Sequence, residues 1–242
     1  MFRTGLAIET AEYAEGLCGT KMTRRRVGRI KITDIRIGEN DAQRLGKSAG
    51  RYISIEGDPQ ERMMPLLVCK ALEQLIPHKG TILVAGLGNP DVAYDSLGSR
   101  CVGMIDRKNG RRKIAAIETD VAAKTGIDTA CMIRAVTREL EATCVIAVDA
   151  LACRDPRRAG GTIQISDTGL QPGSGVTEQT PVLDTDFVGV PVIAVGVPMV
   201  SELWAITHNN MHRGILAAPA NVSQLAAVWA QVIAAAIGDI IL

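Results

Sequence analysis

The chain has 242 residues; hydrophobic residues make up 47% of it and aromatic residues only 3%. This composition predicts one folded domain whose core is built from Ala, Val, Ile and Leu. The formal net charge of +1 gives no general case for binding nucleic acid or an acidic membrane surface. The six cysteines include no C-x-x-C pair, which favours free thiols in a reducing compartment over a disulfide framework.

Two segments near the amino terminus alternate apolar and polar side chains. Arg29–Ile37 and Arg51–Glu56 both follow this pattern, which is typical of half-exposed strands. We expect them to pair antiparallel, as an extension within residues 1–57 of a single domain that spans residues 1–242. The basic segment 21–26 just before them indicates a solvated turn or a protected strand edge rather than a nucleic-acid patch.

From Pro59 onwards, helical and strand patterns alternate along the chain. Helices are predicted around Met63–Leu75, around Asp95, over Ile127–Leu140 and from Val222 onwards; strands are predicted over Ile82–Ala85, Ile114–Ile117, Cys144–Val148, Thr162–Ile165 and Pro191–Val195. This order predicts an α/β fold of three layers, in which a mostly parallel or mixed sheet carries helices on both faces. Because polar residues interrupt the apolar terminal segment, we expect an Ala-rich helix packed on the sheet and a soluble chain.

Two aspartates follow apolar strands at positions 54 residues apart. Asp149 comes directly after Cys144–Val148, and Asp95 comes after Ile82–Ala85 and the turn Gly86-Leu-Gly-Asn-Pro. Because the carboxyl ends of neighbouring parallel strands share one crevice, we expect both carboxyl groups to lie there. A carboxylate is costly to bury without a partner, so the two form a candidate acid–base pair.

Several other motifs have simpler structural explanations. The Gly86 turn lacks G-x-G-x-x-G and G-K-[ST], so we interpret it as a tight turn. Asp167-Thr-Gly is the tripeptide of pepsin-like proteases, but those are all-β proteins; Asp167 follows a strand and is expected near the same crevice. His208 and His212 lack the H-E-x-x-H pattern, so no metal or cofactor is predicted. Ser174 does not match G-x-S-x-G and is interpreted as a loop residue.

Five segments in a fixed order resemble the germination proteases of endospore-forming bacteria. They are Arg3–Glu9, Gly86–Asn89 with Asp95–Gly98, Ala147–Arg154, Thr162–Val176 and Gly189–Pro198. The resemblance implies an atypical aspartic endopeptidase that degrades small acid-soluble spore proteins during germination. It also implies a fold shared with hydrogenase-maturation proteases, a tetrameric assembly and no required metal. We expect a homotetramer or other homo-oligomer in the cytoplasm of the spore core, with no nucleic-acid or membrane partner.

The same resemblance places the two essential aspartates at Asp95 and Asp149. The residues expected to line the substrate groove are Gly86, Gly88, Asn89, Asp167, Gly173 and Ser174. Two carboxyl groups in one apolar crevice cannot both ionise cheaply, so one is expected to stay protonated while the other takes a proton from water. The sequence does not assign which is acid and which is base. Two alternatives stay open: a metal-binding peptidase of the hydrogenase-maturation type, and a non-catalytic sporulation protein with the same fold.

The chain also departs from the family pattern. It is shorter than typical members, with apparent deletions around Val102–Arg112 and Trp204–Arg213. The family removes an amino-terminal propeptide after an acidic residue, and Gly5 occupies that position here. Because glycine offers no carboxylate to such a site, we expect no self-cleavage before Leu6.

Overall fold

The computed structural model describes residues 4–12, 14, 16–106, 112–120, 122–171 and 182–240. Its strands are β1 Lys21–Val27, β2 Ile30–Ile37, β3 Gly50–Glu56, β4 Thr81–Gly86, β5 Ile114–Glu118, β6 Ala142–Cys153, β7 Thr162–Ser166, β8 Val192–Glu202 and β9 Leu216–Ala217. Its α-helices are α1 Ala7–Ala11, α2 Glu39–Leu45, α3 Met64–Glu73, α4 Leu97–Met104, α5 Ala122–Thr125, α6 Thr129–Glu139, α7 Thr185–Val188, α8 Leu203–Thr207 and α9 Val222–Ile240. Three short 3₁₀ turns are η1 Ala93–Asp95, η2 Pro156–Arg158 and η3 Asn210–His212.

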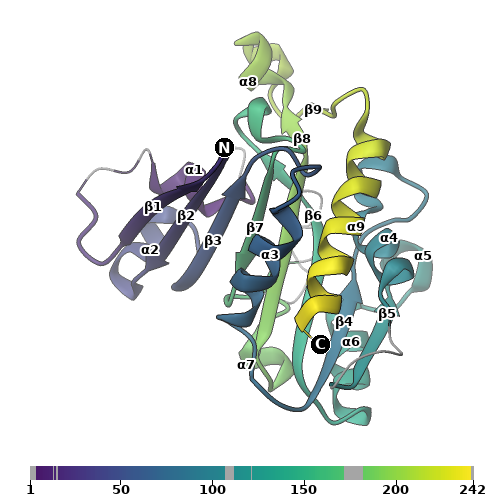
Figure 1. The fold of residues 1–242 in the computed structure, drawn as a ribbon. Coiled ribbons are helices and arrows are strands. Elements are labelled where there is room, and N and C mark those ends of the chain that lie inside the picture. The colour runs from purple at the N-terminus through teal and green to yellow at the C-terminus, as the bar shows by residue number, and fades with distance from the viewer. Residues whose placement is uncertain are drawn as a thin grey trace.

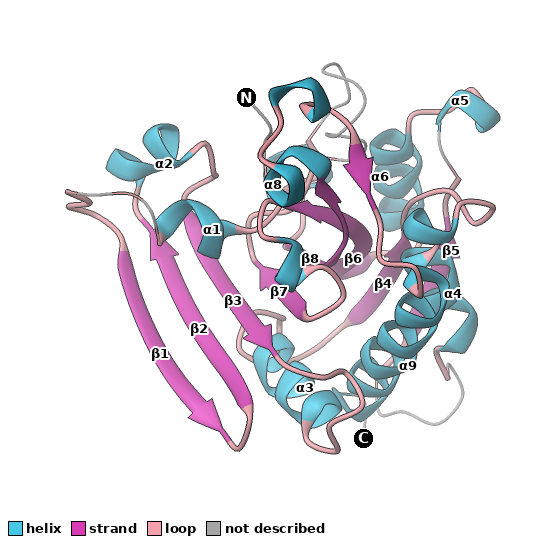
Figure 2. Ribbon diagram, turned by 90° about the horizontal axis from the view of Figure 1, so that it is seen from above, coloured by secondary structure: helices cyan, strands magenta, loops and turns pink. Residues whose placement is uncertain are grey.

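The strands of the described residues form one mixed sheet, seen from two directions in Figures 1 and 2. Their order is β1-β2-β3-β7-β8-β6-β4-β5, and β9 pairs with β8. Strands β8, β6, β4 and β5 run parallel to one another, whereas β1, β2, β3, β7 and β8 pair antiparallel in turn. The carboxyl end of β4, at Gly86, lies beside Val148 of β6, and β6 continues through Asp149 to Cys153.

Helices cover both faces of the parallel half (Figure 1). On β4, Ile82 and Val84 point into a core shared with α3, α4 and α9, while Leu83 and Ala85 point into a second core shared with α6 and α7. This alternation follows from the period of two along a strand, and it explains why the strand is apolar throughout. The predicted three-layer α/β class is confirmed.

The terminal helix α9 lies across the sheet against α3 and α4 (Figure 1). By length and composition alone it could cross a membrane. However, Trp229 is fully buried, and its indole N–H donates to the Gly160 carbonyl at 2.8 Å. The apolar stripe of α9 therefore packs on the rest of the protein, as the helical spacing of its large side chains predicts.

The strands β3, β2 and β1 continue the same sheet beyond its parallel half, with β1 at the margin, as Figure 2 shows. The expected antiparallel pairing of Arg29–Ile37 with Arg51–Glu56 is confirmed in β2 and β3. The basic segment 21–26 forms most of β1, which is an edge strand. Of the two structures expected for this segment, a solvated turn or a strand edge, the chain forms the strand edge.

Candidate active site

The loop after β4 is held against the strands on either side of β4. The Leu87 N–H donates to the Val148 carbonyl of β6 at 2.9 Å. Beyond β5, both the N–H and the hydroxyl group of Thr119 donate to the Gly86 carbonyl. Gly86 itself packs against α4, because a Cβ there would lie 2.3 Å from the Gly98 carbonyl oxygen. These contacts fix where the loop leaves the sheet.

The same loop turns back on itself to hold the carboxyl group of Asp95. The Asn89 N–H donates to Asp95 Oδ2 at 2.7 Å. Gly88 makes this return possible, since its φ of +102° is a conformation that other residues rarely adopt. Asp95 is half-buried, and burial raises its pKa; the nearby charge of Asp120 also raises it, while the bond from Asn89 opposes the shift.

Asp149 lies on β6, which contacts η1, the turn that contains Asp95. The Ala150 N–H donates to Asp149 Oδ1 at 2.8 Å. Burial raises the pKa of Asp149 to about 7; the charge of Asp95 contributes to the rise, and the bond from Ala150 opposes it. The residue keeps some exposure to solvent, although protein surrounds its carboxyl group. The structure therefore brings the two aspartates close enough for their charges to interact.

The other predicted site residues divide into three groups. Gly86, Gly88 and Asn89 form the loop that carries Asp95. Asp167 lies elsewhere: its carboxylate accepts the Arg51 N–H at 2.7 Å, beside β3. Gly173 and Ser174 lie outside the described residues.

The unexpected position of Asp167 results from the direction of β7. Gln164 and Asp149 both pair with Gly196 of β8, so these three residues lie level across the sheet. Because β7 runs antiparallel to β8, the chain moves away from Asp149 as it continues to Asp167. The structure does not place Asp167 in the crevice of the other two aspartates, where a parallel β7 would have placed it.

Gln164 was not predicted as a site residue, yet it holds the amino-terminal segment at the level of Asp149. Its amide nitrogen donates to the Gly5 carbonyl at 3.1 Å, and its amide oxygen accepts the Ala7 N–H at 2.6 Å. The Gly5 N–H also donates to the Ala152 carbonyl of β6 at 2.7 Å. A signal was present in the sequence, because Gln164 is a polar residue between two isoleucines of a strand.

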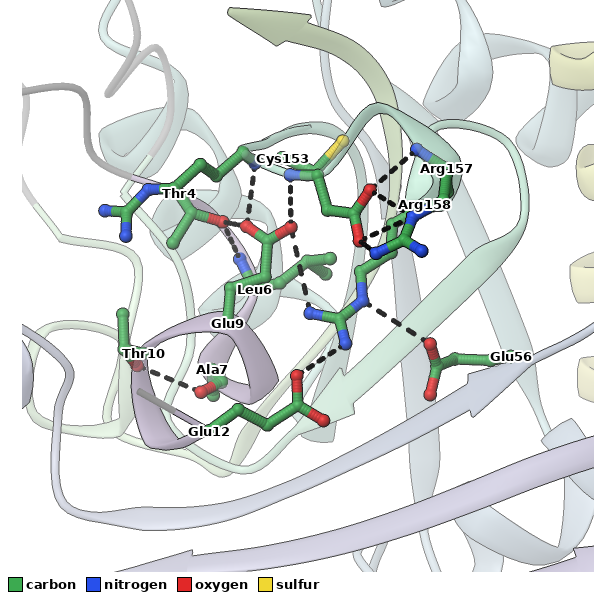
Figure 3. Close-up of polar contacts among 12 residues, drawn as sticks. Thr4, Leu6, Ala7, Glu9, Thr10, Glu12, Glu56, Cys153, Arg157 and Arg158 are labelled. Carbon is green, nitrogen blue, oxygen red and sulfur yellow. Dashed lines mark hydrogen bonds and ion pairs between the residues drawn. The ribbon is translucent and has the colours of Figure 1, made fainter. Parts of the chain in front are cut away.

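A group of charged residues fastens this amino-terminal segment to the end of β6 (Figure 3). Glu9 is buried and accepts hydrogen bonds from the Thr4 hydroxyl group and from the backbone N–H groups of Arg154 and Asp155. Arg158 forms ion pairs with three glutamates; the nitrogen–oxygen distances are 2.7 Å to Glu12, 3.4 Å to Glu56 and 3.8 Å to Glu9. Helix α1 is thereby held at the carboxyl end of β6.

The described residues offer no obvious metal site. Across those ranges, no three His, Cys, Asp or Glu side chains lie together in a way that could hold a metal ion. His208 is exposed, and His212 Nδ1 lies 2.8 Å from the hydroxyl oxygen of Thr207.

The family model described as germination protease matches residues 6–215. The chain belongs to the germination protease family. It is 34% identical to the germination protease of Bacillus velezensis over 87% of this chain and 66% of the relative, and 34% identical to that of Clostridium perfringens over 86% of this chain and 73% of the relative. The chain thus spans 66% of the length of the Bacillus velezensis protein.

Among solved structures, the chain is similar to a NiFe hydrogenase maturation protease from Thermococcus kodakarensis. The two share 17% sequence identity, with a TM-score of 0.44 over 69% of this chain and 98% of that protein.

The raised pKa of Asp149 predicts a stability difference that depends on pH. The folded pKa of about 7 exceeds the ordinary value of 3.8, so folding is penalised progressively as pH rises between these two values. Asp149→Asn removes the penalty. Its free energy of unfolding should therefore exceed that of the wild type by about 2–4 kcal/mol at pH 8, and the excess should disappear near pH 4.

Urea unfolding of both proteins at the two pH values measures this difference. Asp167→Asn is a matched control, because it makes the same chemical change at a site away from the pair. If the wild type and Asp149→Asn had the same free energy of unfolding at pH 8, the pKa of Asp149 in the folded protein would not be raised.

Proposed function

We propose that this member of the germination protease family is an endopeptidase that uses Asp95 and Asp149 to hydrolyse peptide bonds. One observation carries the proposal: the carboxyl groups of Asp95 and Asp149, both with raised pKa values, interact where β4 ends beside β6. Membership of the family supports a protease role in spore germination, and the relatives from Bacillus velezensis and Clostridium perfringens are named germination proteases.

The chemistry follows from the different surroundings of the two carboxyl groups. At neutral pH a pKa of about 7 keeps a large fraction of the Asp149 carboxyl group protonated, so the pair can hold one proton between them. The ionised partner takes a proton from a water molecule, which attacks the carbonyl carbon of the scissile bond. The protonated partner polarises the carbonyl oxygen and supplies a proton to the leaving amine. We leave the two roles unassigned because the pair titrates as a unit.

We propose small acid-soluble spore proteins as the substrates, in the cytoplasm of the spore core, and a homo-oligomer as the working form. The direct test is to incubate the purified chain with such a protein and to determine the masses of the fragments. A few defined fragments, absent when Asp149→Asn is used, are the expected result. An intact substrate after prolonged incubation would favour a non-catalytic role.

Cleavage should survive exhaustive treatment with EDTA. Asp120 is the further acidic residue whose charge acts on the pair. Within the described ranges, no histidine or cysteine lies close enough to complete a set of metal ligands with these aspartates. The measurement is the cleavage rate before and after chelation. Loss of cleavage with recovery on adding a divalent ion would support the metal-binding alternative.

Gly88→Ala should lower both stability and cleavage. A Cβ at this residue would lie 2.2 Å from the Asp95 carbonyl oxygen and 2.8 Å from its Oδ1, in addition to the strain of a positive φ. We expect a loss of about 1–3 kcal/mol in the free energy of unfolding, together with reduced cleavage, because Asp95 must shift.

Gly46→Ala is the matched control for this variant. Gly46 also has a positive φ, of +61°, but nothing lies within 4 Å of the added methyl group. The Gly46→Ala variant should lose about 1 kcal/mol in the free energy of unfolding and keep the wild-type cleavage rate. Equal cleavage by Gly88→Ala and Gly46→Ala would show that the Gly88 loop does not position Asp95 for catalysis.

A further inference from the structure

Strand β1 leaves one edge of the sheet open to another polypeptide. It is the terminal strand in the sheet order, and on its outer side none of the described residues pairs with it. We call Lys21–Val27 the basic edge; most of its side chains are exposed. An edge strand presents a row of backbone N–H and C=O groups that can pair with an added strand. Figure 2 shows β1 at the margin of the molecule, beyond the helices that cover the rest of the sheet.

The hairpin that contains the basic edge carries a charge unlike that of the rest of the chain. Residues 21–36 include seven Lys and Arg and one Asp, which gives a net charge of +6. Since the whole chain has a net charge of +1, the other residues carry −5. The one acidic residue, Asp34, is already paired with Arg51 at 2.7 Å. The positive charge of this hairpin is therefore only slightly compensated.

The arginines of the basic edge are arranged on both faces of the strand. Within the described part of the chain, the side chains of Arg25 and Arg26 form no hydrogen bond or ion pair, while that of Arg24 pairs with Glu12 at 3.1 Å. Side chains alternate between faces along a strand, so Arg24 and Arg26 share one face and Arg25 lies on the other. Both faces are hollowed, by cavities of about 470 Å³ and about 370 Å³. A strand added at this edge would find a guanidinium group on either side.

Two kinds of binding partner, a second copy of this chain and a nucleic acid, fit the basic edge less well. A second copy of β1 would set its own arginines opposite those of the first, and like charges facing each other destabilise a strand pair. A nucleic acid could neutralise the arginines, but its phosphates have no donors for the C=O groups of the edge. No aromatic residue in the segment 21–36 offers a surface on which bases could stack.

We propose that the basic edge binds an extended, acidic segment of another protein, which adds to the sheet as a strand next to β1. Its backbone pairs with the open edge, and its carboxylates lie against Arg24 and Arg26 on one face or Arg25 on the other. Five strand spacings separate β1 from β6, which corresponds to roughly 24 Å. The surface is thus distinct from the aspartate pair and does not depend on peptidase activity.

Fluorescence anisotropy with labelled peptides tests this proposal. The probe is a peptide about as long as β1, with glutamate at alternate positions and threonine between them, titrated with the full chain at constant salt. One comparison peptide replaces each glutamate by lysine. Another keeps the glutamates but carries N-methyl groups on alternate amides, so that it cannot pair along the edge. A single-stranded oligonucleotide of equal negative charge serves as the third comparison.

We expect the glutamate peptide to bind and the other three probes to bind at least about tenfold more weakly. Arg26→Glu should weaken binding of the glutamate peptide by about tenfold, since it turns an attraction into a repulsion. Arg138→Glu is the control, because Arg138 is also exposed but lies on α6. Arg26→Lys should bind nearly as the wild type does.

Circular dichroism of each variant verifies its fold. Equal binding of the N-methylated peptide would overturn strand addition, and equal or tighter binding of the oligonucleotide would identify a nucleic-acid surface instead. Absence of binding to the glutamate peptide, or equal losses in Arg26→Glu and Arg138→Glu, would also overturn the proposal.

Discussion

Asp149→Asn and Asp95→Asn should each reduce peptide cleavage by roughly four orders of magnitude. Asparagine keeps the shape of the side chain but can neither take nor give up a proton. Because the two carboxyl groups act as a pair, loss of either one removes both the activation of water and the protonation of the leaving amine. The measurement is the initial rate of cleavage of a spore-protein substrate, with the fold of each variant verified by circular dichroism.

Asp167→Asn is the control for these variants. Asp167 accepts the Arg51 N–H beside β3 and does not lie level with Asp149. Its replacement should leave the cleavage rate nearly unchanged. If Asp167→Asn were inactive while Asp95→Asn kept its activity, the pair would have been assigned to the wrong residues.

The second large effect concerns stability. Arg158→Met should lower the free energy of unfolding by about 2–3 kcal/mol, because it removes the cation that three glutamates share. Only 11% of the Arg158 side chain is exposed, so water cannot readily replace it. Glu9 is the most buried of the three partners, with 1% of its side chain exposed.

Arg157→Met provides the comparison for this prediction. Arg157 is the next residue in the chain, but 88% of its side chain is exposed, and it pairs with Asp155 at the surface. Its replacement should cost less than about 1 kcal/mol. Both variants can be compared with the wild type by urea unfolding at neutral pH. Equal costs would mean that the contacts of Arg158 around α1 contribute no more than a surface ion pair.

The sequence was sufficient to predict the strands that carry the candidate pair. Cys144–Val148 and Ile82–Ala85 are short apolar runs bounded by turn-forming or polar residues, which is typical of strands buried on both faces. The general rule that ligands bind at the carboxyl ends of parallel strands then placed Asp95 and Asp149 together. Local pattern and a rule of topology were enough for these two residues.

The position of Asp167 could not be predicted in the same way. An alternating or apolar pattern identifies Thr162–Ile165 as a strand but contains no information on its direction. That direction depends on which strands lie next to β7, and these are β3 and β8, far away in sequence. Because β7 pairs antiparallel with both, its carboxyl end lies away from Asp149.

Gln164 and Glu9 were missed for a related reason. Each is a polar residue that becomes buried only when the amino-terminal segment meets the end of the sheet. Gln164 bonds to Ala7, and Glu9 bonds to Arg154. Residues so far apart in the chain cannot be paired from a local periodic pattern. Buried polar groups need hydrogen-bond partners, but the sequence alone does not show where those partners come from.

In the proposed mechanism, Asp95 and Asp149 form a coupled pair in which one proton is retained near neutral pH. The most direct measurement is an NMR titration of the Asp149 carboxyl carbon in carbon-13-labelled protein, in the wild type and in Asp95→Asn. We predict a midpoint near the pKa of about 7 in the wild type and a lower midpoint in Asp95→Asn, because the variant lacks the neighbouring charge. A wild-type midpoint near the ordinary aspartate value, or a midpoint that Asp95→Asn leaves unchanged, would contradict the pair.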